Sequence, residues 1–294
     1  MHGRLGLGSL PHDRRRLRRH RLVAHEGPRI EYAATRLVRG AAAGSWTARV
    51  KLDLEAGRAH PVRLEVELAG VEDWWPAGYG PQPLYGLLAR ASPAGAGRSG
   101  AGGHELRKRI GFRELAVVAE EDAAGKSMVF RVNGRDIFCK GANWIPADAL
   151  PSRWTARRID YLLQSAVDVS MNCLRVWGGG RYESEDFYRL CDEKGILVWQ
   201  DLMFSCALYP SAPAFLAEVE AELRHQVRRL ADHPCLALWC GNNEALGALL
   251  WYPESRANPE RYYIDYDRLY EGTCGRVVRE LDPGKTWWPS SPSA

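Results

Sequence analysis

The sequence predicts a multidomain β plus α/β fold, in which an antiparallel β-sandwich precedes a parallel α/β region. Up to about residue 124, short alternating apolar runs are separated by turns rich in Gly, Pro and Ala, a pattern typical of antiparallel strands. From residue 125, short continuous apolar runs alternate with amphipathic segments, which indicates a parallel sheet covered by helices. We therefore divide the chain into a tail at 1–20, a sandwich at 21–124 and an α/β domain at 125–294.

The first part contains six runs with the length and alternation of strands. They span residues 30–38, 45–54, 62–68, 84–90, 106–110 and 113–118. Short strands at this spacing are typical of an immunoglobulin-like β-sandwich. The stretch 91–103 is nearly all Ala, Gly, Ser and Pro, so we expect an exposed loop there.

The second part opens with a hairpin across the turn Asn133-Gly134. We expect it to pair residues 128–132 with residues 136–138. Strands are then expected at 138–141, 173–176, 196–200, 236–240 and 286–288. Helices are expected between them: one capped by Thr155, one from Ser184 to near Gly195, one through Phe215–Leu230 and one over about 259–281.

Two parallel architectures fit this order of elements, the doubly wound sheet and the (β/α)8 TIM barrel. No Gly-x-Gly-x-x-Gly follows the first strand, so a dinucleotide-binding fold is disfavoured. Polar and aromatic residues instead follow the strands, at 143–144, 175–180, 201 and 242–244. A barrel gathers all its strand ends into one pocket. The sequence therefore favours a truncated TIM barrel with about five strands present.

Composition excludes several classes of function. The chain is 46% hydrophobic and 26% charged, with a net charge of +4, which is ordinary for a soluble globular protein. Much of the basic excess lies in residues 12–21, and because such charge blocks are usually solvated tails, we expect no nucleic-acid partner. No run approaches the ~20 apolar residues of a membrane span, and no signal-peptide pattern is present. We expect no membrane partner, and a cytoplasmic location if the source is bacterial.

The seven cysteines form no Cys-x-x-Cys pair, and several fall inside apolar runs. This pattern favours reduced, buried thiols over disulfides or a zinc site. We therefore expect neither a metal nor a cofactor.

Six motifs occur in an order that resembles the glycoside hydrolase family 2 β-mannosidases, over residues 70 to 292. They lie at 74–85 (WWPAGYGPQPLY), 110–113 (IGFR), 130–134 (FRVNG), 140–148 (KGANWIPAD), 172–180 (NCLRVWGGG) and 241–244 (GNNE). The RVWGGG segment points to the mannosidase branch, because the β-galactosidases and β-glucuronidases of that family usually carry a His-containing sequence there. The resemblance implies a retaining glycosidase that hydrolyses terminal non-reducing β-D-mannose in oligosaccharides or glycoconjugates.

The resemblance also implies roles for individual residues. Glu244 would be the general acid/base, and Asn243 would bind the sugar 2-hydroxyl. Trp177 and Trp144 would line the −1 subsite, and Arg175 would orient the nucleophile by its charge.

Asp201 and Trp251 are weaker candidates for lining the same pocket. The sequence as given reaches what resembles the fifth barrel strand, whereas the family's nucleophilic Glu lies near the end of the seventh strand and is absent from it. We therefore expect the polypeptide alone to be inactive.

Each assignment has a structural alternative. Glu244 could balance a helix dipole, the two tryptophans could be core residues, and Arg175 and Asp201 could form a structural ion pair. Two functional alternatives also stay open: a non-catalytic glycan-binding protein or pseudo-enzyme remnant, and another family 2 specificity such as β-galactosidase or β-glucuronidase.

Overall fold

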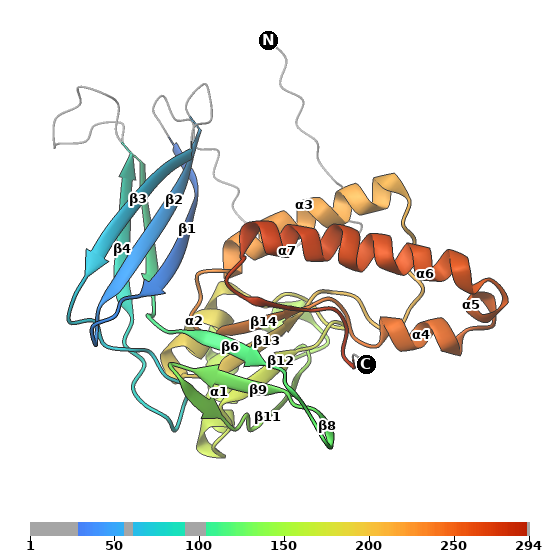
Figure 1. The fold of residues 1–294 in the computed structure, drawn as a ribbon, viewed down its shortest axis with the longest axis horizontal. Coiled ribbons are helices and arrows are strands. Elements are labelled where there is room, and N and C mark those ends of the chain that lie inside the picture. The colour runs from blue at the N-terminus through green and yellow to red at the C-terminus, as the bar shows by residue number, and fades with distance from the viewer. Residues whose placement is uncertain (1–28, 56–60, 92–103, 293–294) are drawn as a thin grey trace, which may run out of the picture.

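A computed structural model describes residues 29–55, 61–91 and 104–292 of the chain. The predicted basic tail and most of the predicted loop at 91–103 lie outside these ranges. Figure 1 shows a group of long antiparallel strands beside a larger region of parallel strands and helices.

The antiparallel part consists of two sheets that face each other. One sheet has the order β1 (Arg29–Arg39), β2 (Trp46–Glu55), β3 (Pro61–Leu68), and the other pairs β4 (Tyr85–Ala91) with β5 (His104–Ile110). Alternating apolar side chains from both sheets form a common core, made of Ile30, Ala33, Val50, Leu52, Ala89 and Ala91. Five of the six predicted strands are therefore confirmed as parts of a two-sheet arrangement.

The sixth predicted strand belongs to a different sheet, so its expected place in the sandwich was wrong. β6 (Leu115–Val118) pairs antiparallel with β9 (Val129–Val132), which in turn pairs with β10 (Arg135–Ile137) across the predicted Asn133-Gly134 turn. Leu115 and Val117 pack against the core of the second part rather than that of the sandwich. The expected boundary at residue 124 thus falls inside this three-stranded sheet. A small hairpin, β7 (Glu121–Asp122) and β8 (Gly125–Lys126), joins β6 to β9.

The second part is built on a five-stranded parallel sheet. Its strands follow chain order: β11 (Gly141–Trp144), β12 (Cys173–Val176), β13 (Leu197–Asp201), β14 (Leu236–Cys240) and β15 (Thr286–Trp288). All residues of β14 are buried, as expected for a strand covered on both faces. Because the strands are parallel, their carboxyl ends lie at one edge of the sheet.

β11 begins three residues later than predicted, and the Asn172 side chain explains the difference. Asn172 accepts a hydrogen bond from the Lys140 backbone N–H at 2.8 Å and donates one to the Phe138 carbonyl at 3.1 Å. These bonds occupy backbone groups that would otherwise join a strand ladder. The ladder starts at Gly141, where an added Cβ would lie 1.7 Å from the Cys173 carbonyl oxygen, so only Gly fits this close approach.

Helices connect the parallel strands. They are η1 (Pro151–Arg153), α1 (Ala156–Asp168), α2 (Glu185–Lys194), α3 (Pro213–Leu230), α4 (Ala245–Trp251), α5 (Pro253–Ala257), α6 (Pro259–Asp267), the π-helical η2 (Arg268–Gly275) and α7 (Arg276–Leu281). Thr155 caps α1 through its hydroxyl, and Gly195 ends α2 at a φ of 72°, as predicted. Ser184 occupies the N-cap of α2 without a capping hydrogen bond from its side chain. In Figure 1, α3 and the run from α6 to α7 lie side by side along the sheet.

Buried polar contacts join the two parts. Lys108 on β5 forms an ion pair of 2.6 Å with Asp232, whose other carboxylate oxygen accepts from the Thr35 backbone N–H. Arg113 donates to the carbonyls of Pro234 and Leu236 at the start of β14. These bonds fix the sandwich against the turn that leads into β14. Among the described residues, no helix is long and apolar enough to cross a membrane.

Candidate active site

Four of the predicted site residues meet at the carboxyl edge of the parallel sheet. Arg175 lies on β12, Asp201 ends β13, and Asn243 and Glu244 follow β14. Arg175 Nη2 is 2.7 Å from Asp201 Oδ2 and 3.0 Å from Asn243 Oδ1, so one guanidinium contacts residues from the ends of two other strands.

Asp201 is fully enclosed by hydrogen-bond donors. Its Oδ1 accepts from Arg175 Nε and from Trp199 Nε1, and its Oδ2 accepts from Arg175 Nη2 and from the Gly178 backbone N–H, all within 3.2 Å. The Asp201 side chain has no exposed surface, whereas that of Arg175 is 19% exposed. A bidentate pair of this kind is rigid. In this structure the Asp201 carboxylate holds Arg175 in place, as expected if the two residues form a structural ion pair.

The backbone after β14 has an unusual conformation at Glu244. Asn243 is 7% exposed and bridges to the backbones of Ser205 and Ser291 on its two sides. Glu244 then takes a left-handed φ of 58° at the N-cap of α4, a region that non-glycine residues rarely adopt and that is enriched at functional sites. The buried Asn242 side chain caps the same helix by accepting from the Ala245 N–H at 2.9 Å.

Trp144 and Trp177 lie next to each other at the ends of β11 and β12, and both are partly buried. The Trp177 N–H donates to the Trp144 carbonyl at 3.1 Å. Trp144 also donates from Nε1 to Glu183 Oε1 at 3.1 Å, and its ring packs on Phe187 of α2 with centroids 4.9 Å apart. The Trp177 ring lies over Gly179, where an added Cβ would come within 2.0 Å of it.

Trp251 is a predicted residue for which no described contact with this cluster is found. It ends α4, is 49% exposed, and its ring lies near Gly247 of the same helix. A role for Trp251 at the site stays a prediction.

Three residues of the cluster were not predicted from the sequence. Ser205 and Cys206 lie in the loop between β13 and α3 and contact the side chains of Asn243 and Glu244. Glu183 is 3% exposed and holds Trp144. No periodicity or motif distinguishes the two loop residues, and Glu183 could have been found only from the aromatic cluster that it supports.

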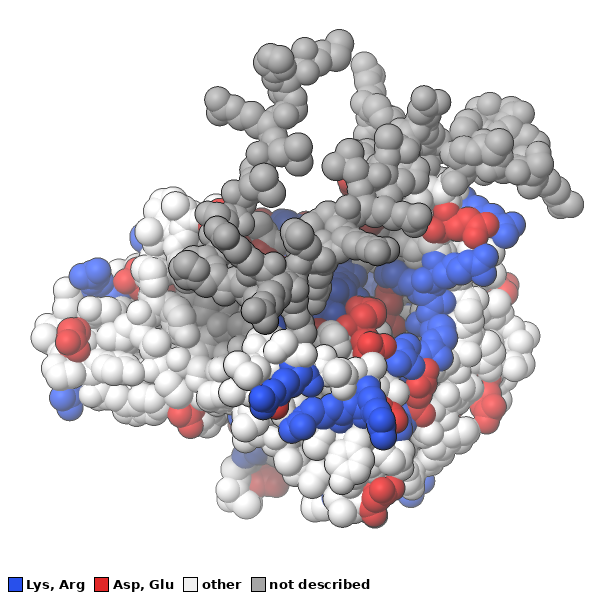
Figure 2. Space-filling view, turned by 180° about the vertical axis from the view of Figure 1, so that it is seen from behind, with Lys and Arg blue, Asp and Glu red and all other residues white. Residues whose placement is uncertain are grey.

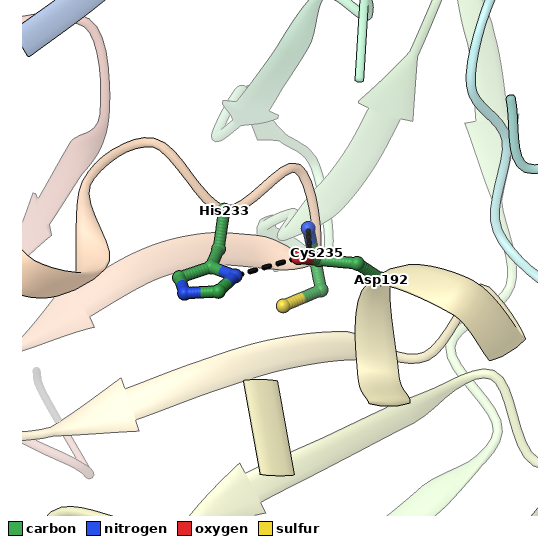
Figure 3. A group of neighbouring side chains, drawn as sticks. All are labelled: Asp192, His233 and Cys235. Atoms are coloured by element: carbon green, nitrogen blue, oxygen red, sulfur yellow. Dashed lines mark hydrogen bonds and ion pairs between the residues drawn. The ribbon is translucent and has the colours of Figure 1, made fainter. Parts of the chain in front are cut away.

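One group of side chains has the composition of a metal site, and it lies away from this cluster. Asp192, His233 and Cys235 offer ligand atoms within 4.8 Å of one another (Figure 3). Asp192 Oδ2 is 2.6 Å from His233 Nδ1, and Asp192 Oδ1 accepts from the Cys235 backbone N–H. Burial alone would lower the pKa of His233, but Asp192 and Glu185 outweigh it and raise the pKa to about 9. Both ring nitrogens of His233 contact carboxylates, so the protonated ring forms a largely buried ion pair with Asp192.

His233 also borders a groove between the sandwich and the second part. The groove has a volume of about 530 Å³ and is lined by residues of β4, β5, α2, α3 and the turn before β14. Its basic side chains face acidic partners: Lys108 pairs with Asp232, and Arg229 pairs with Glu185. Figure 2 shows basic and acidic side chains interspersed on one side of the molecule.

Comparison with known proteins identifies relatives over most of the chain. It is 44% identical over 227 residues to a β-mannosidase of Bos taurus and 42% identical over 236 residues to that of Mus musculus. It is 39% identical over 226 residues to β-mannosidase B of Aspergillus oryzae. These matches cover 74–79% of this chain but 25–26% of the relatives, so the chain spans about a quarter of their length. No family model matches the chain.

Solved structures give the same result. The β-D-mannosidase of Dictyoglomus thermophilum superposes with a TM-score of 0.79 at 31% identity, over 92% of this chain and 36% of that one. An exo-chitosanase of Amycolatopsis orientalis superposes with a TM-score of 0.67 at 19% identity, over 90% of this chain and 32% of that one, and shows the shared fold alone.

These relatives make the chain a homologue of one segment of the glycosidases, about a quarter of the relatives' length. Within that class the chain is a homologue of the β-mannosidases, which confirms the resemblance drawn from its sequence.

Proposed function

We propose that this chain contributes the acid/base half of the active site of a retaining β-mannosidase. In this proposal an immunoglobulin-like sandwich that ends before β6 precedes the first strands of a (β/α)8 barrel, and β6 lies on the barrel side. The homology to β-mannosidases supports the substrate class. The observation that carries the proposal is the contact of Arg175 with Asn243, which gathers the ends of β12, β13 and β14 beside Glu244.

Glu244 would act twice in this mechanism. As a nucleophilic carboxylate attacks the anomeric carbon, the bond to the leaving oxygen breaks, and Glu244 transfers its proton to that oxygen. Water then attacks the glycosyl-enzyme, Glu244 takes the proton from that water, and the bond to the nucleophile breaks. No residue of this chain is assigned as the nucleophile.

The neighbouring side chains would position the sugar. Asn243 would bind the 2-hydroxyl, a contact that strengthens as the anomeric carbon gains positive charge. Trp144 and Trp177 would present apolar ring faces to the mannose, and Arg175 would orient the nucleophile. Because Asp201 is enclosed by four donors, we assign it to holding Arg175 rather than to contacting the sugar.

The test compares the Glu244→Gln variant with wild type. Both are expressed from the reading frame that contains this chain, after sequencing of its transcript. Wild type should hydrolyse aryl β-mannosides in preference to aryl β-galactosides and β-glucuronides. Glu244→Gln should lower kcat/KM at least ~100-fold for mannosides with poor leaving groups, because general acid catalysis is worth about that much. Glu254→Gln, at an exposed glutamate of α5, is the matched control and should keep full activity.

Other outcomes would contradict the proposal in distinguishable ways. Faster hydrolysis of the galactoside or glucuronide would indicate another specificity. Binding of mannose without any hydrolysis would indicate a glycan-binding protein. Equal activity of Glu244→Gln and wild type would remove Glu244 from the chemistry.

A further inference from the structure

Cys206 contacts both functional groups at the end of β14. Its Sγ is 3.4 Å from Glu244 Oε2, 3.3 Å from Asn243 Nδ2 and 3.4 Å from Ser205 Oγ. Its backbone is fixed as well, because its N–H donates to the Asn243 carbonyl at 2.9 Å and its carbonyl accepts from Tyr252 Oη at 2.6 Å. The sulfur atom is therefore held between the carboxylate and the amide.

The hydrogen-bond roles in this group follow from the donors and acceptors available. Arg175 can only donate, so its contact with Asn243 Oδ1 fixes the amide with Nδ2 toward Cys206. That Nδ2 can only donate, so the sulfur accepts from it. An ionised Glu244 can only accept, which leaves the single thiol hydrogen of Cys206 directed at Oε2.

Both residues of the contact between Cys206 and Glu244 have a strained backbone. Cys206 has a φ of 52° and Glu244 a φ of 58°, so the two residues that meet are both in the left-handed region. Residues other than glycine rarely adopt this region, and it persists where surrounding contacts hold it. The strained loop and the strained strand end thus present the thiol and the carboxylate to each other.

We propose that Cys206 is a positioning residue for the acid/base carboxylate, an inference that rests on the proposed role of Glu244. The thiol binds Oε2 and fixes the rotation of the carboxylate. Among the described residues, Oε1 has no hydrogen-bond partner, so it is the oxygen presented for proton transfer. Arg175 sets this arrangement indirectly, because it orients the Asn243 amide on which the sulfur rests.

The contact is tested first by thiol alkylation of the 1–294 polypeptide, read site by site with peptide mass spectrometry. The thiol hydrogen that Cys206 donates to Glu244 must be given up before the sulfur can react with iodoacetamide. Glu244→Gln should therefore raise the rate at which iodoacetamide modifies Cys206 at least threefold at pH 8. Glu254→Gln should leave that rate unchanged, and Cys139 serves as an internal control in every sample. Equal Cys206 rates in wild type and Glu244→Gln would overturn the proposal.

The role is tested next in the protein expressed from the transcript-verified reading frame. Cys206→Ala should lower kcat/KM about tenfold for a mannoside with a poor leaving group and much less for the 2,4-dinitrophenyl mannoside, which needs little acid assistance. Cys206→Ser keeps a donor and should restore most of the loss. A purely structural role would lower activity on both substrates equally and would overturn the proposal.

The alkylation and hydrolysis experiments together distinguish a failure of this proposal from a failure of the proposed function. If wild type fails to hydrolyse mannosides while Glu244→Gln still accelerates alkylation, the proposed function is wrong and the catalytic role of Cys206 is lost with it. If hydrolysis depends on Glu244 but the alkylation rates are equal, only the positioning role of Cys206 is wrong.

Discussion

Deprotonation of His233 is expected to weaken the buried ion pair that it forms at the start of β14. Its ring contacts Asp192 at 2.6 Å and Glu185 at 3.2 Å. Although burial opposes the charged ring, the carboxylates raise its pKa from an ordinary value of 6.5 to about 9. Because the folded-state pKa is the higher one, the stabilisation is fully present below about pH 6.5 and is lost as the pH rises through about 9.

A rise of this size corresponds to about 3 kcal/mol of folding free energy. Most of it is assigned to Asp192, whose side chain is 5% exposed, since the Glu185 side chain is 63% exposed and water screens its charge. The His233 side chain is itself only 12% exposed, which keeps the main interaction in a poorly solvated position.

The assay is urea denaturation of wild type, His233→Gln and His225→Gln at several pH values between 6 and 10. The difference in free energy of unfolding between wild type and His233→Gln should be largest near pH 6 and shrink by about 3 kcal/mol as the pH passes 9. His225 is exposed on α3, so His225→Gln should keep the wild-type pH dependence. A difference between wild type and His233→Gln that stays constant from pH 6 to 10 would refute the ion pair.

Two further changes test packing at the sheet. Gly141→Ala should destabilise the protein by more than about 3 kcal/mol, because its Cβ would lie 1.7 Å from the Cys173 carbonyl oxygen, whereas Gly86→Ala faces open space; thermal melts of both compare them directly. Arg175→Leu should cost about 3–5 kcal/mol, because it leaves the buried Asp201 carboxylate without its cation. An unchanged melting temperature for Arg175→Leu would show that this ion pair does not stabilise the fold.

Much of the second part could be predicted because its strands are short apolar runs followed by polar residues. β12, β14 and β15 begin and end at the predicted residues. The meeting of Arg175 with Asn243 followed from the same logic, since parallel strands bring their carboxyl ends to one edge.

The errors have a common physical origin, which is competition between local pattern and contacts distant in sequence. Strand β6 alternates like its predecessors, yet Leu115 and Val117 pack against the core of the second part. The first parallel strand was predicted at 138–141, but the Asn172 side chain bonds the backbone groups of Phe138 and Lys140, and the strand begins at Gly141.

Loop positions at the site were beyond prediction for a further reason. Cys206 reaches Glu244 only because both residues adopt a left-handed backbone, which neither residue type favours. Glu183 is a buried carboxylate whose described partner is the indole of Trp144, and no local pattern in the sequence requires that contact.

The parallel sheet has a consequence for how this polypeptide could associate with other chains. Among the described residues, β11 and β15 each pair with a neighbour on one side only. The outer N–H and C=O groups of such strands are templates for strand addition from another chain. A separately synthesised polypeptide that carries matching strands would attach at these two margins. Such an association would depend on protein concentration by mass action.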